Sequence, residues 1–183
     1  MMESSGFYCM FSVSPATLAS HKVVWRRMDR RMSAAAVSEV DDKFLGLRPC
    51  IPQETCVFVS CSSKEEALYL SAVLNSALVD FIAQSYNVRG GKGFGSPNLL
   101  QFVKLPRFEP KNAVHLELSE LAFRCHDVVS GGETGTQRSL EAAIDELAAS
   151  LWAVSGDALK TIQGVLERTR SGAQDGDEED SEE

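Results

Sequence analysis

The sequence of 183 residues has no apolar run near the roughly 20 residues that cross a bilayer as a helix. Its first residues lack a basic lead followed by an apolar stretch, which is the pattern of a secretory signal. The five cysteines are scattered, odd in number and never spaced as Cys-x-x-Cys, so neither a disulfide framework nor a zinc site is indicated. These absences lead us to expect a reduced, cytoplasmic protein.

Recognisable catalytic motifs are absent as well. No Pro-Pro pair and no G-x-S-x-G string occurs, and the glycine-rich segment 89–97 fits neither a dinucleotide-binding nor a phosphate-binding loop. His115 and His126 are eleven residues apart, which on one helix is about 16 Å and too far for one metal ion. We therefore identify no catalytic residue, no metal site and no cofactor site in this chain.

Charge is unevenly distributed along the sequence. The net charge is -8, but seven of the 26 acidic residues follow Arg170, where no base occurs. Residues 22–111 instead carry 13 Lys and Arg against 9 Asp and Glu. An acidic run of this kind is typical of a solvated, disordered tail, which we place at 169–183. The alternative, that the tail screens a basic face when nucleic acid is absent, stays open.

Hydrophobic patterning predicts an α+β chain, with strands and helices mixed in the first part and helices alone behind. We expect an α+β domain at 1–111 and a helical part at 112–168, followed by the acidic tail. Apolar, β-favouring runs indicate the strands. The predicted strands cover 7–13, 22–25, 55–59 and 99–105.

The strongest helix signal follows residue 61. Ser62 with Glu65, or Ser63 with Glu66, makes a capping box, in which hydroxyl and carboxylate each satisfy a free backbone amide. Apolar residues at helical spacing continue behind it to about Gln84 or Tyr86. The later predicted elements are a helix carrying Val114 to Cys125, a linker at 131–137, a helix carrying Leu140 to Leu151, and a third helix capped by Ser155.

Two basic segments are candidates for a nucleic-acid surface. The first runs from Lys22 to Arg31 and has five bases to one acid, and the second extends from the glycine-rich loop to Lys104 and Arg107. Long cationic side chains bind phosphates, glycines allow close approach, and Arg or Asn can read base edges. Cations that are merely solvated and paired with nearby acids explain these segments equally well. Trp25 follows two valines and is expected in the core.

Six strings carry a resemblance, and they occur along the chain in one order. They are K-V-V-W-R-R-M at 22–28, E-E-A-L-Y-L-S-A-V-L-N-S at 65–76, G-K-G-F-G-S-P-N-L-L at 91–100 with V-K-L-P-R-F-E-P at 103–110, H-L-E-L-S-E-L at 115–121, and I-D-E-L-A-A-S-L-W-A-V-S at 144–155. Together they resemble the C-terminal, target-recognition region of adenine-specific DNA methyltransferases of the type II methylase-restriction and phage-exclusion kinds. The resemblance covers roughly residues 6–166.

That resemblance implies a module that docks on double-stranded DNA and selects the sequence to be modified. In such proteins a methyltransferase domain binds S-adenosylmethionine and flips the adenine out of the stack. The motifs of that domain do not occur here, so the resemblance implies a methyltransferase domain or subunit in trans, or one that has been lost, and a domain 1–111 truncated at its N-terminus. The DNA-binding candidates, from resemblance and from chemistry, are Lys22, Arg26, Arg27, Arg30, Arg31, Lys92, Phe94, Ser96, Asn98 and Lys104.

An alternative of a different class is a protein-interaction module that docks a partner subunit through its C-terminal helices. The apolar faces at 114–125 and 140–151 would serve that role. Packing into the protein's own core explains these faces as well.

Overall fold

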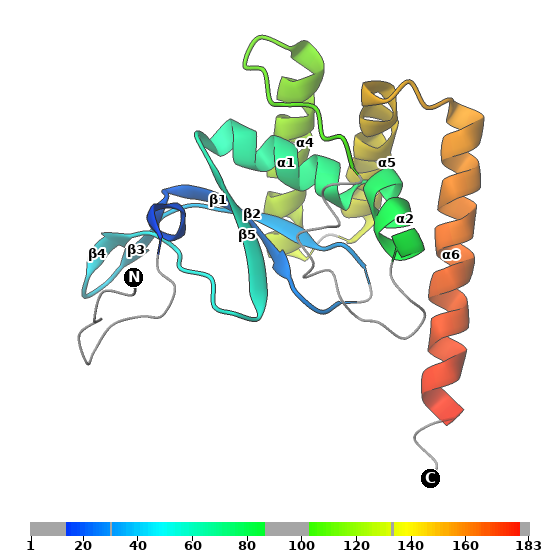
Figure 1. The fold of residues 1–183 in the computed structure, drawn as a ribbon, viewed down its shortest axis with the longest axis horizontal. Coiled ribbons are helices and arrows are strands. Elements are labelled where there is room, and N and C mark those ends of the chain that lie inside the picture. Colours follow the sequence, from blue (N-terminus) through cyan, green and yellow to red (C-terminus); the bar gives the residue numbers. More distant parts are fainter. Residues whose placement is uncertain (1–13, 30, 87–102, 133, 180–183) are drawn as a thin grey trace, which may run out of the picture.

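The computed structural model describes residues 14–29, 31–86, 103–132 and 134–179, and its fold is α+β, with antiparallel strands first and helices behind (Figure 1). This confirms the predicted fold class. The strands are β1 (His21–Arg26), β2 (Ala34–Val37), β3 (Val40–Asp42), β4 (Gly46–Arg48) and β5 (Cys56–Cys61). The helices are the 3-10 helix η1 (Pro15–Leu18) and the α-helices α1 (Lys64–Asn75), α2 (Ala77–Tyr86), α4 (Ala113–Gly131), α5 (Thr134–Leu151) and α6 (Gly156–Glu179).

Strand β1 is the middle strand of an antiparallel sheet with the order β2-β1-β5. Along β5 it pairs Val23 with Val59 and Trp25 with Val57. Val23 and Trp25 are buried beneath the helices, because alternate side chains of a strand point to the same face. Strands β1 and β5 confirm the two strands that the sequence predicts in these places.

Strand β2 was not predicted, because its alanine-rich sequence carries little β propensity. A side chain from the end of α1 fixes it instead. The Asn75 Oδ1 atom accepts a hydrogen bond from the Ala34 amide at 2.7 Å, and Asn75 Nδ2 donates to the Ala34 carbonyl at 2.7 Å. The amide group of Asn75 therefore satisfies both backbone groups of Ala34, as a neighbouring strand would.

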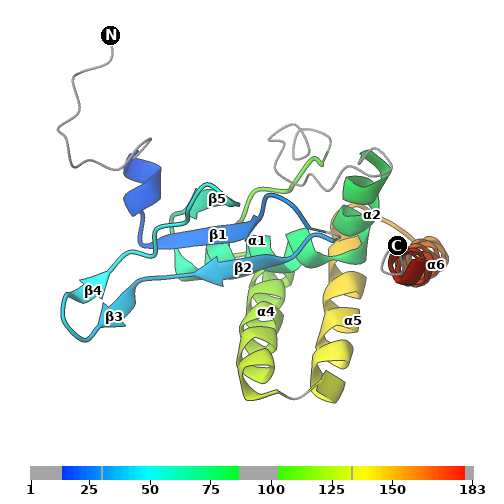
Figure 2. The same ribbon diagram turned by 90° about the horizontal axis from the view of Figure 1, so that it is seen from below.

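The main core lies between the sheet and the helices. Helix α1 packs against β1 and β2, and α4 and α5 lie side by side against α1 (Figures 1 and 2). Tyr69 is fully buried in this core, and its hydroxyl donates to the Pro106 carbonyl at 2.9 Å. The His115 ring lies beside it at a tilt of 35°, with 4.6 Å between the ring centroids, and its Nδ1 accepts a hydrogen bond from the Glu109 amide.

Helices α1 and α2 occupy the stretch in which the sequence predicts one helix. The Ser63 hydroxyl accepts from the Glu66 amide at 3.1 Å, which confirms the second of the two proposed caps. The helix then breaks at Ser76, whose backbone is extended, and the two halves are bent by 59°. Among the described residues no single helix is long and apolar enough to cross a membrane, and α1 with α2 passes that test only as a bent pair.

The helices at the C-terminal end largely agree with those predicted from the sequence. Asn112 caps α4, because its side-chain oxygen accepts from the amide two residues on at 3.0 Å. Gly132 has a φ of +79° and ends α4, and α5 begins two residues later, so most of the linker predicted at 131–137 is helical. The Ser155 hydroxyl accepts from the Ala158 amide at 3.3 Å, which confirms the predicted cap of the third helix.

Helix α6 packs on α2 through a second apolar cluster that contains Leu78, Ala148, Leu159 and Leu166. The helix continues to Glu179, where it overlaps the acidic tail predicted at 169–183. Side chains beyond residue 169, and all of residues 180–183, lie outside the described part of the chain.

Two of the predicted strands fall on residues that the structure does not describe or describes only in part. The candidate strand at 7–13 lies outside the described residues. Of the strand predicted at 99–105, only residues 103–105 are described, and these do not form a strand.

Candidate nucleic-acid interface

The segment between β1 and β2 carries the arginines of the first basic motif. Two buried side chains hold its ends, since Trp25 and Met32 are each 4% exposed. The Met32 amide also donates to the Asp80 carboxylate on α2 at 3.0 Å. The core therefore holds the segment at both of its ends.

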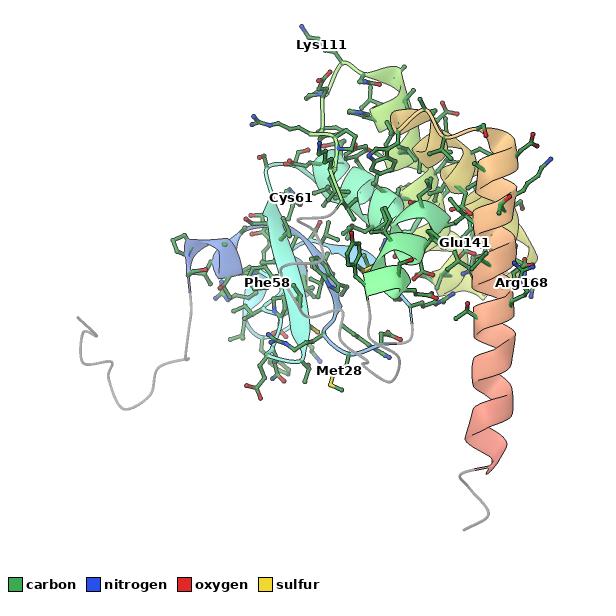
Figure 3. The ribbon with its side chains drawn as sticks, turned by 45° about the vertical axis from the view of Figure 1, so that its right-hand side comes forward. Met28, Phe58, Cys61, Lys111, Glu141 and Arg168 are labelled. Carbon is green, nitrogen blue, oxygen red and sulfur yellow. The ribbon has the colours of Figure 1, made fainter. Side chains whose placement is uncertain are left out.

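The described arginines of this segment face solvent. The Arg26 side chain is 76% exposed and lies 3.9 Å from the Asp29 carboxylate. Arg27 is exposed and donates from Nε to the Glu54 carbonyl at 3.0 Å, and Arg31 is exposed as well. The Asp29 side chain is 22% exposed, so the pair is partly buried on the carboxylate side, whereas the Arg26 guanidinium stays accessible to a phosphate. Met28, in the middle of the segment, projects away from the body (Figure 3).

Arg30 lies outside the described residues, and Lys22 requires a correction. Lys22 is only 1% exposed, and its ammonium group donates to the Ala19 carbonyl. Burial lowers the pKa of Lys22, because the charged form loses its hydration. In this structure Lys22 is therefore not available to a phosphate. It alternates with Val23 along β1 and is buried on the opposite face of the sheet.

The second basic segment is described only where it returns to the core. Val103 is 4% exposed and belongs to the same apolar cluster as Trp25 and Met32. Next to it, Lys104 is exposed, and its carbonyl accepts a hydrogen bond from the Trp152 indole at 3.0 Å. The remaining candidates of this segment, Lys92, Phe94, Ser96 and Asn98, lie outside the described residues.

The described parts of the two basic segments are attached to the same apolar core cluster. Both are attached to the main core through buried apolar residues, and Arg107 adds a further exposed cation to the second segment. Guanidinium and ammonium groups held this way can bind phosphates, because phosphate binding needs cations that reach the backbone rather than a shaped pocket.

A groove that the sequence did not reveal lies at the other end of β1. It consists of two hollows of about 480 Å³ and 430 Å³, which share Lys64, Leu68 and Phe123. The first is also lined by His21, Ala36, Ser38, Glu39, Leu47 and His126, and the second by Glu65, Leu116, Ser119 and Glu120.

Polar contacts order the walls of this groove. The His21 ring lies 3.1 Å from the Ser38 hydroxyl, and the Lys64 ammonium lies 4.7 Å from the centre of the Phe123 ring. Burial lowers the pKa of His126. Within the described chain no group of three or more His, Cys, Asp or Glu side chains is arranged to hold a metal ion.

The apolar residues of α4 divide between core and surface. Leu118, Leu121 and Ala122, which belong to the face predicted at 114–125, are buried in the core. Leu116 and Phe123 are instead 42% and 44% exposed. Their spacing of seven residues on one helix face was the available sequence signal for the groove.

Comparisons with known proteins add nothing to these observations, since no protein-family model, no curated protein and no solved structure matches the chain.

Proposed function

We propose that this protein is a DNA-binding sequence-specificity module, of the kind that serves an adenine-N6 DNA methyltransferase or a restriction-modification enzyme. Its partners would be double-stranded DNA and a methyltransferase domain or subunit that binds S-adenosylmethionine. The resemblance of its ordered sequence strings motivates the enzyme class. The exposed side chains of Arg26, Arg27 and Arg31 motivate the DNA contact.

One observation supports the DNA contact above the others. Arg26, Arg27 and Arg31 are exposed on a short segment whose two ends are buried in the core. A cationic side chain whose neighbouring backbone is anchored in the core loses less conformational entropy on binding than one on a free loop does. Of these arginines, Arg26 forms an ion pair in the described chain, in which the arginine side chain is 76% exposed and that of Asp29 22%.

The test is DNA binding as a function of salt, measured by fluorescence anisotropy with a random-sequence duplex of about 30 base pairs. We expect the logarithm of the affinity to fall linearly with the logarithm of salt, by about 0.9 for each phosphate neutralised. Replacing Arg26, Arg27 and Arg31 with alanine should weaken binding and flatten that slope. Arg124→Ala with Arg138→Ala, at exposed positions of α4 and α5, is the matched control and should change neither. A salt-independent affinity would rule out phosphate contact.

Specificity needs a separate measurement, because phosphate contacts position a protein and base contacts select the sequence. Selection from a random duplex pool should enrich one motif with the parent chain. Lys92→Ala or Asn98→Ala should broaden that motif and leave the salt slope nearly unchanged. If no motif is enriched although the salt slope is steep, the protein binds DNA but is not a specificity module.

A further inference from the structure

The groove on α1 and α4 exposes an apolar strip. Leu116 and Phe123 of α4 line it, and their side chains are 42% and 44% exposed. Leu68 of α1 lines both hollows of the groove. Leu116 and Phe123 are two helical turns apart on one face of α4, which is about 10 Å along the helix axis. An apolar strip of this length matches about two turns of a second helix.

The lining of the groove is acidic. Glu39, Glu65 and Glu120 belong to it, and Lys64 is the single lysine or arginine among its lining residues. One positive charge against three negative charges leaves the lining at -2, counted with histidine neutral. Burial lowers the pKa of His126, which keeps that ring neutral near neutral pH. Such a lining repels a polyanion such as DNA and attracts a cationic partner.

One cation of the chain itself already lies on an aromatic ring in this groove. The Lys64 ammonium is 4.7 Å from the centre of the Phe123 ring, and the Lys64 side chain is exposed. Within the described part of the chain, none of the three glutamates of the lining forms an ion pair. The face of an aromatic ring attracts ammonium and guanidinium groups, so Phe123 supplies apolar area and a place for a cation together. A lysine or arginine of a partner can therefore replace Lys64 on the ring.

We infer that the groove on α1 and α4 binds a basic amphipathic helix of a partner protein. A helix that lies in a groove presents apolar side chains at the spacing i, i+3, i+4 and i+7, and its polar side chains flank them. The apolar face of the partner helix packs on Leu116 and Phe123, and its flanking lysines or arginines lie beside Glu65 and Glu120. The apolar strip thus selects an amphipathic segment, and the acidic lining selects a cationic one.

This docking site is separate from the proposed DNA contact. His21, at the start of β1, lines the groove, whereas the arginine segment follows the end of β1. The two surfaces also have opposite charge, so they select different partners. Failure of peptide binding does not affect the DNA proposal, and failure of DNA binding does not affect the docking site.

Fluorescence anisotropy of the full chain with labelled synthetic peptides tests the inference. The basic probe has about 14 residues, with leucine along one helical face and lysine elsewhere. The acidic probe has glutamate in place of each lysine, and the polar probe has serine in place of each leucine. At about 150 mM salt, which screens long-range attraction, we expect the parent to bind the basic probe at least about tenfold more tightly than either other probe.

Charge reversal tests the acidic lining. Glu65→Lys with Glu120→Lys should reverse the preference, so that this variant binds the acidic probe more tightly than the basic one. Glu141→Lys with Glu146→Lys, at exposed positions of α5, makes the same change in net charge outside the groove and should keep the preference of the parent. This control is needed because the acidic residues after Arg170 also attract a basic peptide.

Two single substitutions test the apolar strip. Phe123→Ser and Leu116→Ser should each weaken binding of the basic probe by at least about tenfold, and using both guards against a folding defect at one position. Val129→Ser, at a residue of α4 that is 57% exposed and outside the groove lining, should bind as the parent does. Far-UV circular dichroism checks that each variant is folded. The docking site is overturned by a parent that binds all three probes alike, by folded strip variants that keep the parent affinity, or by equal effects of the two charge reversals.

Discussion

Adjacent residues of β1 have opposite roles. Trp25 is 4% exposed and joins the core under α1, whereas Arg26 is exposed and starts the arginine segment. Lys22 shows that alternation alone does not decide which cation is exposed. It lies on the face opposite Val23, but that face is covered too, so its ammonium group is turned to the Ala19 carbonyl.

Replacing Lys22 with methionine tests this placement. We expect DNA affinity and its salt slope to stay at the parent values, since the ammonium group does not reach solvent. The stability difference should depend on pH with a definite sign. The folded-state pKa of Lys22 lies below 10.5, so as pH rises through that folded value toward 10.5 only the unfolded chain keeps the proton. Parent stability relative to Lys22→Met should therefore rise over that window.

Urea unfolding of both proteins at about pH 7 and about pH 10 measures this difference. Lys43→Met, at an exposed position of the turn between β3 and β4, is the control and should show no such rise. A salt slope reduced by Lys22→Met would mean that Lys22 turns outward to the DNA.

Cys61 offers a second prediction at this scale. Burial, with the nearby Glu66 carboxylate, raises the pKa of its thiol to about 11. At pH 8 only about one thiol in a thousand is then the reactive thiolate. Iodoacetamide should label Cys61 in the folded protein far more slowly than in urea, as mass spectrometry of the peptides can measure. Equal labelling rates in the folded protein and in urea would show that the Cys61 thiol is accessible in the folded protein.

At the scale of elements, the break between α1 and α2 depends on a distant helix. The Ala77 amide at the start of α2 donates to the Asp145 carboxylate of α5 at 2.7 Å, and Gln163 of α6 donates to the same carboxylate at 2.8 Å. The Ser76 hydroxyl donates to the Val73 carbonyl at 2.7 Å at the end of α1. Asp145 thus caps α2 from outside its own sequence and ties three helices together.

Asp145→Ala should lower the free energy of unfolding by about 1 to 3 kcal/mol, because it leaves a buried helix end without its acceptor. Asp145→Asn keeps an acceptor oxygen and should cost less. Glu141→Ala is the control, since Glu141 is an exposed residue of the same helix. Chemical denaturation gives the values, and equal losses for Asp145→Ala and Glu141→Ala would show that the cap contributes nothing.

At the scale of the whole molecule, the sheet separates two surfaces. The arginine segment lies at one end of β1, and the β3–β4 hairpin and the groove on α1 and α4 lie at the other. We expect the triple alanine variant of Arg26, Arg27 and Arg31 to sediment as the parent does. Each substitution should change stability by no more than about 1 kcal/mol, because the ion pair of Arg26 and the hydrogen bond of Arg27 are single contacts of exposed side chains. A larger loss of stability would show that these arginines also stabilise the fold.

Much of the fold followed from local sequence. Strands β1 and β5, the cap at Ser63, helix α4 and the cap at Ser155 each depend on neighbouring residues, so periodicity and capping chemistry were enough to find them. The exposed arginines were likewise visible as a composition bias. Long-range partners explain what was missed, and β2 is the clearest case because Asn75 rather than its own sequence holds it.

The sequence by itself determined the α+β class, the order of most elements and the position of the cationic segments, because these depend on residues close together in the chain. Only the tertiary structure decided that Lys22 is buried while Arg26 is exposed, that α2 begins anew under Asp145, and that Phe123 faces a groove. Burial, and capping by a distant helix, depend on which elements pack together in the folded chain. A pattern of neighbouring residues does not specify that packing.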